Sequence, residues 1–318
     1  MTDRPICVLG NLNADLVMGP LASWPAHGTE CFLDRCDFRA GGSAGNTALV
    51  LHRLGIRAGL VSSTGDDDLA VMLAEPFHGP LDRIARLTGR TGISVGVTHP
   101  DSDRSFLSFA GHLDRTDLAL MRGQLAGWPL DGALALVSGG FAMPGLRPGM
   151  RALLDLLRTQ GAETAIDPGW PGEGWTKATR AEVLTWAGAA RHLLLNDKEV
   201  CGITGQADPA AAAQALCDRL GGDTVVVVKC GPEGALAVTA AGRARATAAP
   251  LAPFETVGAG DAFNAGYLAA LARGAGLQAA LQEGTRTAGT VISAFPRDTG
   301  PLPGWSQDAT QHPSADRR

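Results

Sequence analysis

Small residues precede a carboxylate in ETVGAGDAFNAGYLAALARG at 255–274. Gly258, Ala259 and Gly260 lead straight into a stretch with helical spacing, and their small size leaves successive backbone N–H groups open to an anion. Asp261 follows on the first helical turn, where it is either a helix cap or a functional carboxylate. A cap needs no Gly-Ala-Gly before it. The pattern therefore favours phosphoryl transfer to an alcohol, with the amides stabilising the phosphoryl oxygens and Asp261 accepting the hydroxyl proton.

Two polar side chains follow the first apolar run, in VLGNLNADLV at 8–17. Asn13 and Asp15 are two positions apart, so on an extended chain both point to the same side. In that arrangement they can bind two hydroxyls of one sugar. Asn and Asp are also common in plain turns, which is the simpler interpretation of this segment alone.

A pair of glycines precedes a predicted helix in AGGSAGNTALVLHRLG at 40–55. Gly41 and Gly42 allow a ligand to approach the backbone, and the start of the helix offers free N–H groups. Asn46, on the first turn, can both donate and accept hydrogen bonds. By itself the glycine pair is weak evidence for a site.

Two further segments follow apolar runs that are typical of buried strands. Asn196 and Glu199 in HLLLNDKEV lie where a strand ends, the edge at which α/β sheets bind ligands, and can hold a hydrated Mg²⁺ and a phosphate. Gly231 and Gly234 in VVVVKCGPEGALAV form either a nucleotide-binding loop or a simple turn. No G-x-x-x-x-G-K-[ST] loop occurs and no G-x-G-x-x-G follows the first strand, which argues against a P-loop enzyme and a dehydrogenase.

The elements that must position these residues alternate along the chain. Continuous apolar runs, as expected of strands buried on both faces of a parallel sheet, occur at 6–10, 59–63, 133–139, 163–167, 192–196 and 224–230. Ala- and Leu-rich segments with helical spacing lie between them, at 148–160, 209–220 and 277–294. This alternation predicts a doubly wound α/β fold.

Two segments interrupt the alternation with shorter, period-two patterns, at 11–40 and 90–112. In the second, ISVGVT at 93–98, the turn HPDSD and RSFLSF are typical of a β-hairpin. We expect these segments to form a small β layer that serves as a lid over a cleft. A pair of ordinary surface hairpins is the alternative.

Composition restricts the class of protein. The chain has 318 residues, 45% of them hydrophobic, which excludes a disordered protein, and its net charge of −5 argues against a general nucleic-acid binder. No apolar run is long enough to span a membrane, and the N-terminus lacks a signal-peptide pattern, so we expect a cytoplasmic protein. The six cysteines have no metal-ligand spacing, and nothing supports a redox role for Cys31 and Cys36. Residues 301–318 are polar and contain prolines, so we expect them to form a disordered tail.

In this order, the sites resemble those of the ribokinase-like (PfkB) family of carbohydrate kinases, over about residues 5–301. GGSAGNTA followed by Gly55 and Gly65 is similar to the first family signature. ETVGAGDAFNAG is similar to the second, usually written D-T-x-G-A-G-D. The resemblance implies a kinase domain over 1–300 with a Rossmann-like, doubly wound α/β fold: a mostly parallel sheet with helices on both faces, plus a small β-sheet lid.

The resemblance also implies roles for single residues. Asp261 would be the catalytic base, and Gly258, Ala259 and Gly260 the anion hole for the γ-phosphate of ATP. The implied sugar-binding residues are Asn13, Asp15, Gly41, Gly42 and Asn46. The implied nucleotide-binding residues are Asn196, Lys229, Gly231 and Gly234. Glu199 would bind Mg²⁺ through water, and a homodimer through the lid is implied as well.

The chain departs from the family pattern at two of these segments. Glu255 stands where the family usually has Asp, in a region that supports a monovalent cation in ribokinase-like members, which argues against activation by K⁺. Lys229 stands where Thr is common, which changes the contact to the phosphates. The segment after 133–137 lacks an acidic residue that ribokinase itself has, which argues against ribose as the substrate.

Three alternatives remain beside a sugar kinase. A nucleoside kinase of the same family needs an aromatic clamp, for which the candidates are Phe106, Phe109 and Phe141. A sugar-phosphate kinase needs converging basic residues, and the candidates in the predicted lid are Arg35, Arg39 and Arg104. A catalytically silent sugar- or nucleotide-binding protein is disfavoured because Asp261 and the Gly-Ala-Gly run are intact.

Overall fold

The larger of two sheets has nine strands, in a computed structural model that describes residues 4–100, 103–294 and 300–302. In spatial order they are β13 (Gly242–Ala246), β12 (Ala235–Thr239), β11 (Val225–Lys229), β10 (His192–Asn196), β9 (Glu163–Asp167), β8 (Leu134–Ser138), β1 (Ile6–Gly10), β4 (Ala58–Thr64) and β5 (Arg83–Arg86). From β11 to β5 the strands are parallel, whereas β12 and β13 are antiparallel to their neighbours. The six apolar runs all form strands of this sheet, with ends within one residue of those predicted.

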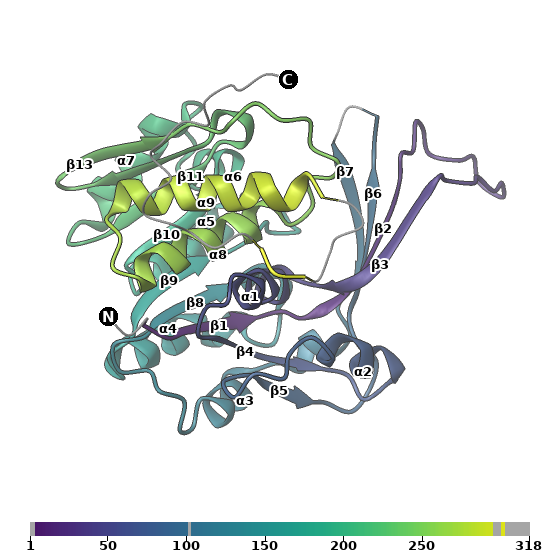
Figure 1. The fold of residues 1–318 in the computed structure, drawn as a ribbon, viewed down its shortest axis with the longest axis horizontal. Coiled ribbons are helices and arrows are strands. Elements are labelled where there is room, and N and C mark those ends of the chain that lie inside the picture. The colour runs from purple at the N-terminus through teal and green to yellow at the C-terminus, as the bar shows by residue number, and fades with distance from the viewer. Residues whose placement is uncertain (1–3, 101–102, 295–299, 303–318) are drawn as a thin grey trace, which may run out of the picture.

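Helices cover both faces of this sheet (Figure 1). One core contains side chains of α1 (Ser43–Arg53), α2 (Asp68–Ala74), α8 (Ala259–Ala272) and α9 (Leu277–Ile292). The core on the other face contains side chains of α3 (Leu118–Gln124), α4 (Met150–Thr159), α5 (Lys177–Ala187), α6 (Asp197–Thr204) and α7 (Pro209–Leu220). Helix α8 is Ala-rich and mostly apolar apart from the side that carries Asp261 and Asn264, and it is largely buried. The predicted doubly wound, mostly parallel fold is therefore confirmed.

The two period-two segments form one separate sheet rather than two surface hairpins. Its order is β3 (Arg35–Gly41), β2 (Asn13–Gly19), β6 (Ile93–Thr98) and β7 (Arg104–Phe109). Strands β2 and β6 are parallel neighbours, so they join the two segments, and the alternative of independent hairpins is wrong. In Figure 1 this sheet extends away from the α/β body, and we call it the lid sheet.

Short 3₁₀ turns complete the described chain, at Gly111–Arg115, Gly140–Ala142, Arg147–Gly149 and Gly231–Glu233. Of the predicted C-terminal tail, 303–318 lies outside the described residues. Within the part of the chain that the structure describes, no helix is long and apolar enough to cross a membrane.

Candidate active site

The predicted functional residues gather at one edge of the large sheet. Strands β1, β8, β9, β10 and β11 are parallel, so their carboxyl ends share this edge, and Asn196 and Lys229 are the last residues of neighbouring strands. Asp167 ends β9 at the same edge. Helices α1 and α8 both begin beside the ends of these strands and pack against each other. The topology thus brings together segments that are more than 200 residues apart.

Asp261 lies in the first turn of α8, and its carboxylate is held by a side chain from α1. Asn46 Nδ2 donates to Asp261 Oδ2 at 2.9 Å. Asn46, predicted to bind the sugar, thus contacts the predicted base, and its sugar-binding role stays a prediction. Gly258, the residue before α8, has φ of 77°, a left-handed backbone that glycine adopts without strain. The N–H of Ala259 donates to the carbonyl of Thr256 at 3.2 Å, so one of the three predicted anion-binding amides already has a partner.

Burial changes the proton affinity of Asp261. Burial and, to a smaller extent, the nearby Asp167 raise the pKa of this carboxyl to about 7, against the opposing effects of Asn46 and Lys229. An ordinary aspartate is a weak base at neutral pH. A carboxyl that titrates near pH 7 is suited to accept a proton from a hydroxyl.

The predicted sugar-binding residues at the start of the chain form a connected polar cluster. Asn13 Nδ2 donates to Asp15 Oδ1 at 2.7 Å, so the two side chains share one side as their spacing predicted. Asn11 Nδ2 donates to Asn13 Oδ1 at 3.0 Å, and Asn11 Oδ1 accepts from the N–H of Ser43 at 3.1 Å. Asn11 was not predicted as a site residue. It lies two positions before Asn13, so on extended backbone its side chain points to the same side.

Gly41 and Gly42 lie directly against this cluster, so close that a side chain at either position would collide with it. A Cβ on Gly41 would collide with the carboxyl of Asp15. Gly42 has φ of 83°, and a Cβ there would collide with Asn11 and Asn13. Burial raises the pKa of Asp15 to about 6, although the nearby Arg39 lowers it. The glycines therefore allow the backbone before α1 to approach the polar cluster closely.

A cavity of about 370 Å³ opens between this cluster, the lid sheet and the loops that follow β8 and β9. Its polar side chains are all neutral: Asn11, Asn13, Ser43, Ser94 and Ser108. Its aromatic side chains are Phe109, Phe141 and Trp170. None of the described residues that line it carries a charge. Phe109 and Phe141 were predicted as aromatic candidates, whereas Phe106 does not line the cavity and Trp170 was not predicted.

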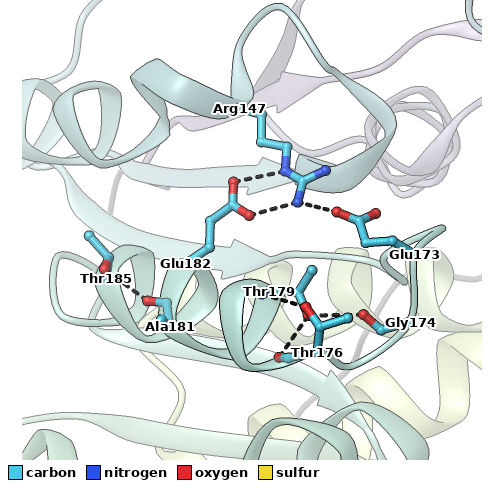
Figure 2. A network of polar contacts seen from close by, with 8 residues as sticks. All are labelled: Arg147, Glu173, Gly174, Thr176, Thr179, Ala181, Glu182 and Thr185. Atoms are coloured by element: carbon cyan, nitrogen blue, oxygen red, sulfur yellow. Dashed lines mark hydrogen bonds and ion pairs between the residues drawn. The ribbon is translucent and has the colours of Figure 1, made fainter.

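A charged cluster of Arg147, Glu173 and Glu182 anchors the loop between β9 and α5 (Figure 2). Arg147 donates to both carboxylate oxygens of Glu182, at 2.8 and 2.7 Å, and pairs with Glu173 in the loop. The same guanidinium lies over the ring of Phe141, 4.8 Å from its centre. In the loop, the carbonyl of Gly174 accepts from the Thr179 hydroxyl at 2.9 Å. These contacts hold the aromatic wall of the cavity in place.

Asn196 and Glu199 form a reciprocal helix cap at the start of α6. Asn196 Oδ1 accepts from the N–H of Glu199 at 2.8 Å, and Glu199 Oε2 accepts from the N–H of Asn196 at 2.8 Å. Glu199 is buried, which raises its pKa, and the neighbouring charge of Asp167 raises it further. The spacing that resembles a nucleotide-binding motif is thus also a capping box, and it fixes the position of both side chains.

Lys229 lies in a network that includes two residues not predicted from the sequence. Its Nζ donates to Asp167 Oδ2 at 2.8 Å and to Asn264 Oδ1 at 3.2 Å. Gly231 and Gly234, just beyond, form a tight turn in which the N–H of Gly234 donates to the carbonyl of Gly231 at 3.0 Å. No motif marked Asp167; its place at the end of a buried strand was the available signal.

Glu255 contacts the lid sheet. Its carboxylate accepts two hydrogen bonds from Arg39 of β3, at 3.1 and 2.9 Å, and Arg35 lies 3.8 Å away. Arg104 of β7 donates to the Thr256 hydroxyl at 2.9 Å. The lid arginines thus bind the segment before α8 and do not line the cavity, which argues against a sugar-phosphate acceptor.

An α/β body with a β-sheet lid, and a half-buried carboxylate held by Asn46 in the first turn of α8, is the arrangement expected of a carbohydrate kinase. Residues 4–300 match the pfkB family carbohydrate kinase pattern, and the chain belongs to this family. The predicted family and enzyme class are confirmed.

The proteins that this chain is similar to are named as kinases of different substrates. It is 25% identical over 244 residues to a probable fructokinase-7 of Arabidopsis thaliana, across 73% of this chain and 70% of that protein. It is 28% identical over 247 residues to an aminoimidazole riboside kinase of Salmonella typhimurium, across 73% and 74% of the two chains. The solved structure of an adenosine kinase from Sinorhizobium meliloti has the same fold, with a TM-score of 0.77, 22% identity, and coverage of 95% of this chain and 96% of that one.

Proposed function

We propose that the protein transfers the γ-phosphoryl group of ATP to a hydroxyl of an uncharged sugar or sugar-like alcohol. The single observation that carries this proposal is the hydrogen bond between Asn46 and Asp261. It holds a carboxyl that titrates near neutral pH at the start of α8. Asn46 lies one helical turn after Ser43, which lines the neutral cavity. The predicted base is thereby linked to the predicted acceptor site.

In the proposed reaction the chain mainly positions groups. Asn11, Asn13 and Asp15 bind acceptor hydroxyls, and Asp261 orients the attacking hydroxyl and accepts its proton. Phosphoryl transfer has a loose transition state, so alignment and charge stabilisation contribute more than the strength of the base. The backbone at Gly258 and Gly260 stabilises the phosphoryl oxygens.

Magnesium fits this site as a companion of the nucleotide. Among the described residues, no three His, Cys, Asp or Glu side chains are arranged to hold a metal ion. We propose that Mg²⁺ arrives with the nucleotide and is held largely by its phosphates and by water. Glu199, fixed by its cap, would contact the hydrated ion. When bound, Mg²⁺ neutralises phosphate charge.

Replacing the predicted base tests the proposal. We expect Asp261→Asn to lower kcat by about 10²–10⁴-fold, because the amide cannot accept the hydroxyl proton. The KM for ATP should change little. Release of ADP, measured across pentoses, hexoses, polyols and nucleosides, is the readout. If Asp261→Asn kept full activity on an acceptor that the wild type phosphorylates, Asp261 would not be the base.

A second candidate function is supported by the aromatic wall. A nucleoside, or another sugar with a flat apolar substituent, could place its ring against Phe141 and Trp170, whose side chain is 53% exposed. The charged cluster of Figure 2 fixes this wall, which would reduce the entropic cost of binding such a ring.

Loss of the exposed indole tests the second candidate. Trp170→Ala should raise the KM for nucleosides about tenfold, because stacking against an aromatic side chain is lost, and leave the KM for simple sugars nearly unchanged. Trp24→Ala is the matched control, because Trp24 is similarly exposed at 55% but does not line the cavity. Equal effects on both acceptor classes would contradict a ring-binding role.

We also propose a homodimer through the lid sheet. Phe38, Leu16, Val95 and Leu107 are direct cross-strand neighbours, so they form one apolar row across all four strands. Arg39, adjacent to Phe38, faces Glu255 of the body, so the apolar row lies on the opposite, outer face. Phe38 is 46% and Leu107 58% exposed, and a second copy of the same row would cover both.

A further inference from the structure

Four ionisable side chains from four elements influence one another beneath the start of α8. Asp167 ends β9, Lys229 ends β11, Glu199 lies in α6 and Asp261 lies in α8. Burial alone would lower the pKa of Lys229, but Asp167 and Glu199 outweigh that effect and raise it. Lys229 is therefore a charged ammonium at neutral pH, among three carboxyl groups.

The ammonium of Lys229 is held in one position. Asp167 Oδ2 accepts from Lys229 Nζ at 2.8 Å and from Asn264 Nδ2 at 2.7 Å, and Asn264 Oδ1 accepts from Nζ at 3.2 Å. The three side chains thus form a closed triangle between β9, β11 and α8. The Lys229 side chain is only 12% exposed, so little of this charge is screened by water.

The triangle lies directly against the predicted anion hole. A Cβ added to Gly260 would lie 3.4 Å from Lys229 Nζ, so no other side chain separates the ammonium from the Gly260 backbone. Asn264 follows Asp261 by three residues on α8, which places both on the same side of the helix. The fixed cation and the predicted base therefore adjoin the same three-residue segment.

We propose that Lys229, held by Asp167 and Asn264, is a positioning residue that stabilises negative charge developing at the anion hole formed by the start of α8. This inference rests on the proposed phosphoryl transfer. A fixed charge beneath Gly260 adds to the backbone N–H groups and needs no rearrangement when the phosphoryl oxygens arrive. The amide of Ala259 already donates to the carbonyl of Thr256, and the charge of Lys229 would make up for this missing donor to the phosphoryl oxygens.

The group around Asp261 determines how variants should shift its titration. Asp167 of β9 and Asp15 of β2 raise its pKa, whereas Asn46 of α1 and Lys229 of β11 lower it. Removing Lys229 alone should move the acid limb of the pH–rate profile upward. Removing the charge of Asp167 alone should move it downward. A purely structural role of the pair predicts no such opposite shifts.

The decisive variant replaces both members of the ion pair. Lys229→Met alone leaves Asp167 buried without its cation and could fail to fold. The double variant Lys229→Met with Asp167→Asn removes both charges, and the new amide can still pair with Asn264. Lys177→Met, at an exposed lysine of α5, is the matched control.

We expect the double variant to unfold near the wild-type temperature. Compared on the alkaline plateau of each pH–rate profile, its kcat should be about 10²-fold below that of the wild type, with a smaller rise in the KM for ATP. Lys177→Met should match the wild type. A folded double variant with wild-type kcat would overturn the inference and leave the pair a purely structural role.

If the wild type phosphorylates no acceptor, the proposed function fails instead. Calorimetric binding of a non-hydrolysable ATP analogue then tests Lys229 separately, because equal affinities of wild type and double variant would also overturn it.

Discussion

Burial makes the carboxylate of Asp261 a less stable anion, and for that reason a stronger base. The folded protein raises the pKa of this carboxyl to about 7, above its value of about 3.9 in an unfolded chain. Such a group stabilises the fold fully below the unfolded pKa, and this contribution is lost as the pH rises through the folded pKa.

The residue scale therefore supports a prediction about stability. Asp261→Asn is neutral at every pH and can still accept from Asn46. Its free energy of unfolding should exceed that of the wild type increasingly from about pH 4 to about pH 7, by about 4 kcal/mol at most, and level off above. Denaturant unfolding of both proteins at several pH values measures the difference. A difference that does not vary with pH would contradict the raised pKa.

Sequence motifs identified single residues better than their partners. The Gly-Ala-Gly run and Asp261 were evident because small residues have few other reasons to precede a carboxylate. The contact between Asn46 and Asp261 joins positions 215 residues apart, and no local spacing encodes it. Asp167, Asn264 and Trp170 were not predicted, although the first two lie in segments that the sequence singled out, because their partners come from distant parts of the chain through the packing of α8 and the loop after β9.

At the scale of elements, Glu255 connects β3 of the lid sheet to the segment that leads into α8. Two hydrogen bonds from Arg39 satisfy this buried carboxylate, and the neighbouring bond from Arg104 to Thr256 adds a second connection from β7. Because β2 carries Asp15 opposite Arg39, the ion pair between Arg39 and Glu255 joins the proposed acceptor site to the proposed anion hole.

Neutralising Glu255 should weaken this connection. Glu255→Gln leaves Arg39 buried without one of its anionic partners, so we expect a loss of about 2 kcal/mol in the free energy of unfolding and a rise of about tenfold in the acceptor KM. Glu30→Gln, in the exposed loop of the lid segment, is the control. Wild-type kinetics in Glu255→Gln would contradict the link.

Because the carboxylate of Glu255 already faces the guanidinium groups of Arg39 and Arg35, we also expect the wild type to be equally active in K⁺ and tetramethylammonium salts.

Elements of the buried sheet were predictable, and those at its edges were not. Continuous apolar runs mark β1, β4 and β8–β11 because these strands are covered on both faces. Strands β5 and β13 are the two edges of the sheet, where shorter or polar sequences such as RIAR and GRARA suffice, so their periodicity was too weak to predict them.

At the scale of the whole molecule, the lid sheet leaves an apolar row uncovered on its outer face. Its strand order, β3-β2-β6-β7, arises from pairing between β2 and β6, which are some 80 residues apart, and sequence patterns do not encode such pairing. The period-two patterns could therefore predict a β layer but not which face would be exposed.

Charge placed on that face should prevent association. We expect the wild type to sediment as a dimer at micromolar concentration and Leu107→Lys to sediment as a monomer, because a buried ammonium in a symmetric apolar interface meets its own copy. Val71→Lys is the control, at a similarly exposed apolar residue of α2. A monomeric wild type would exclude the lid dimer.

The loop between β9 and α5 has a practical consequence for changing what the enzyme accepts. Its shape depends on Arg147, Glu173 and Glu182, which are far in sequence from α8 and its carboxylate. Replacing this loop as a unit, while keeping Arg147, Glu173 and Glu182, should change which acceptor is phosphorylated and leave α8 and Asp261 unchanged. Directed evolution of new specificity can thus begin from residues 169–176.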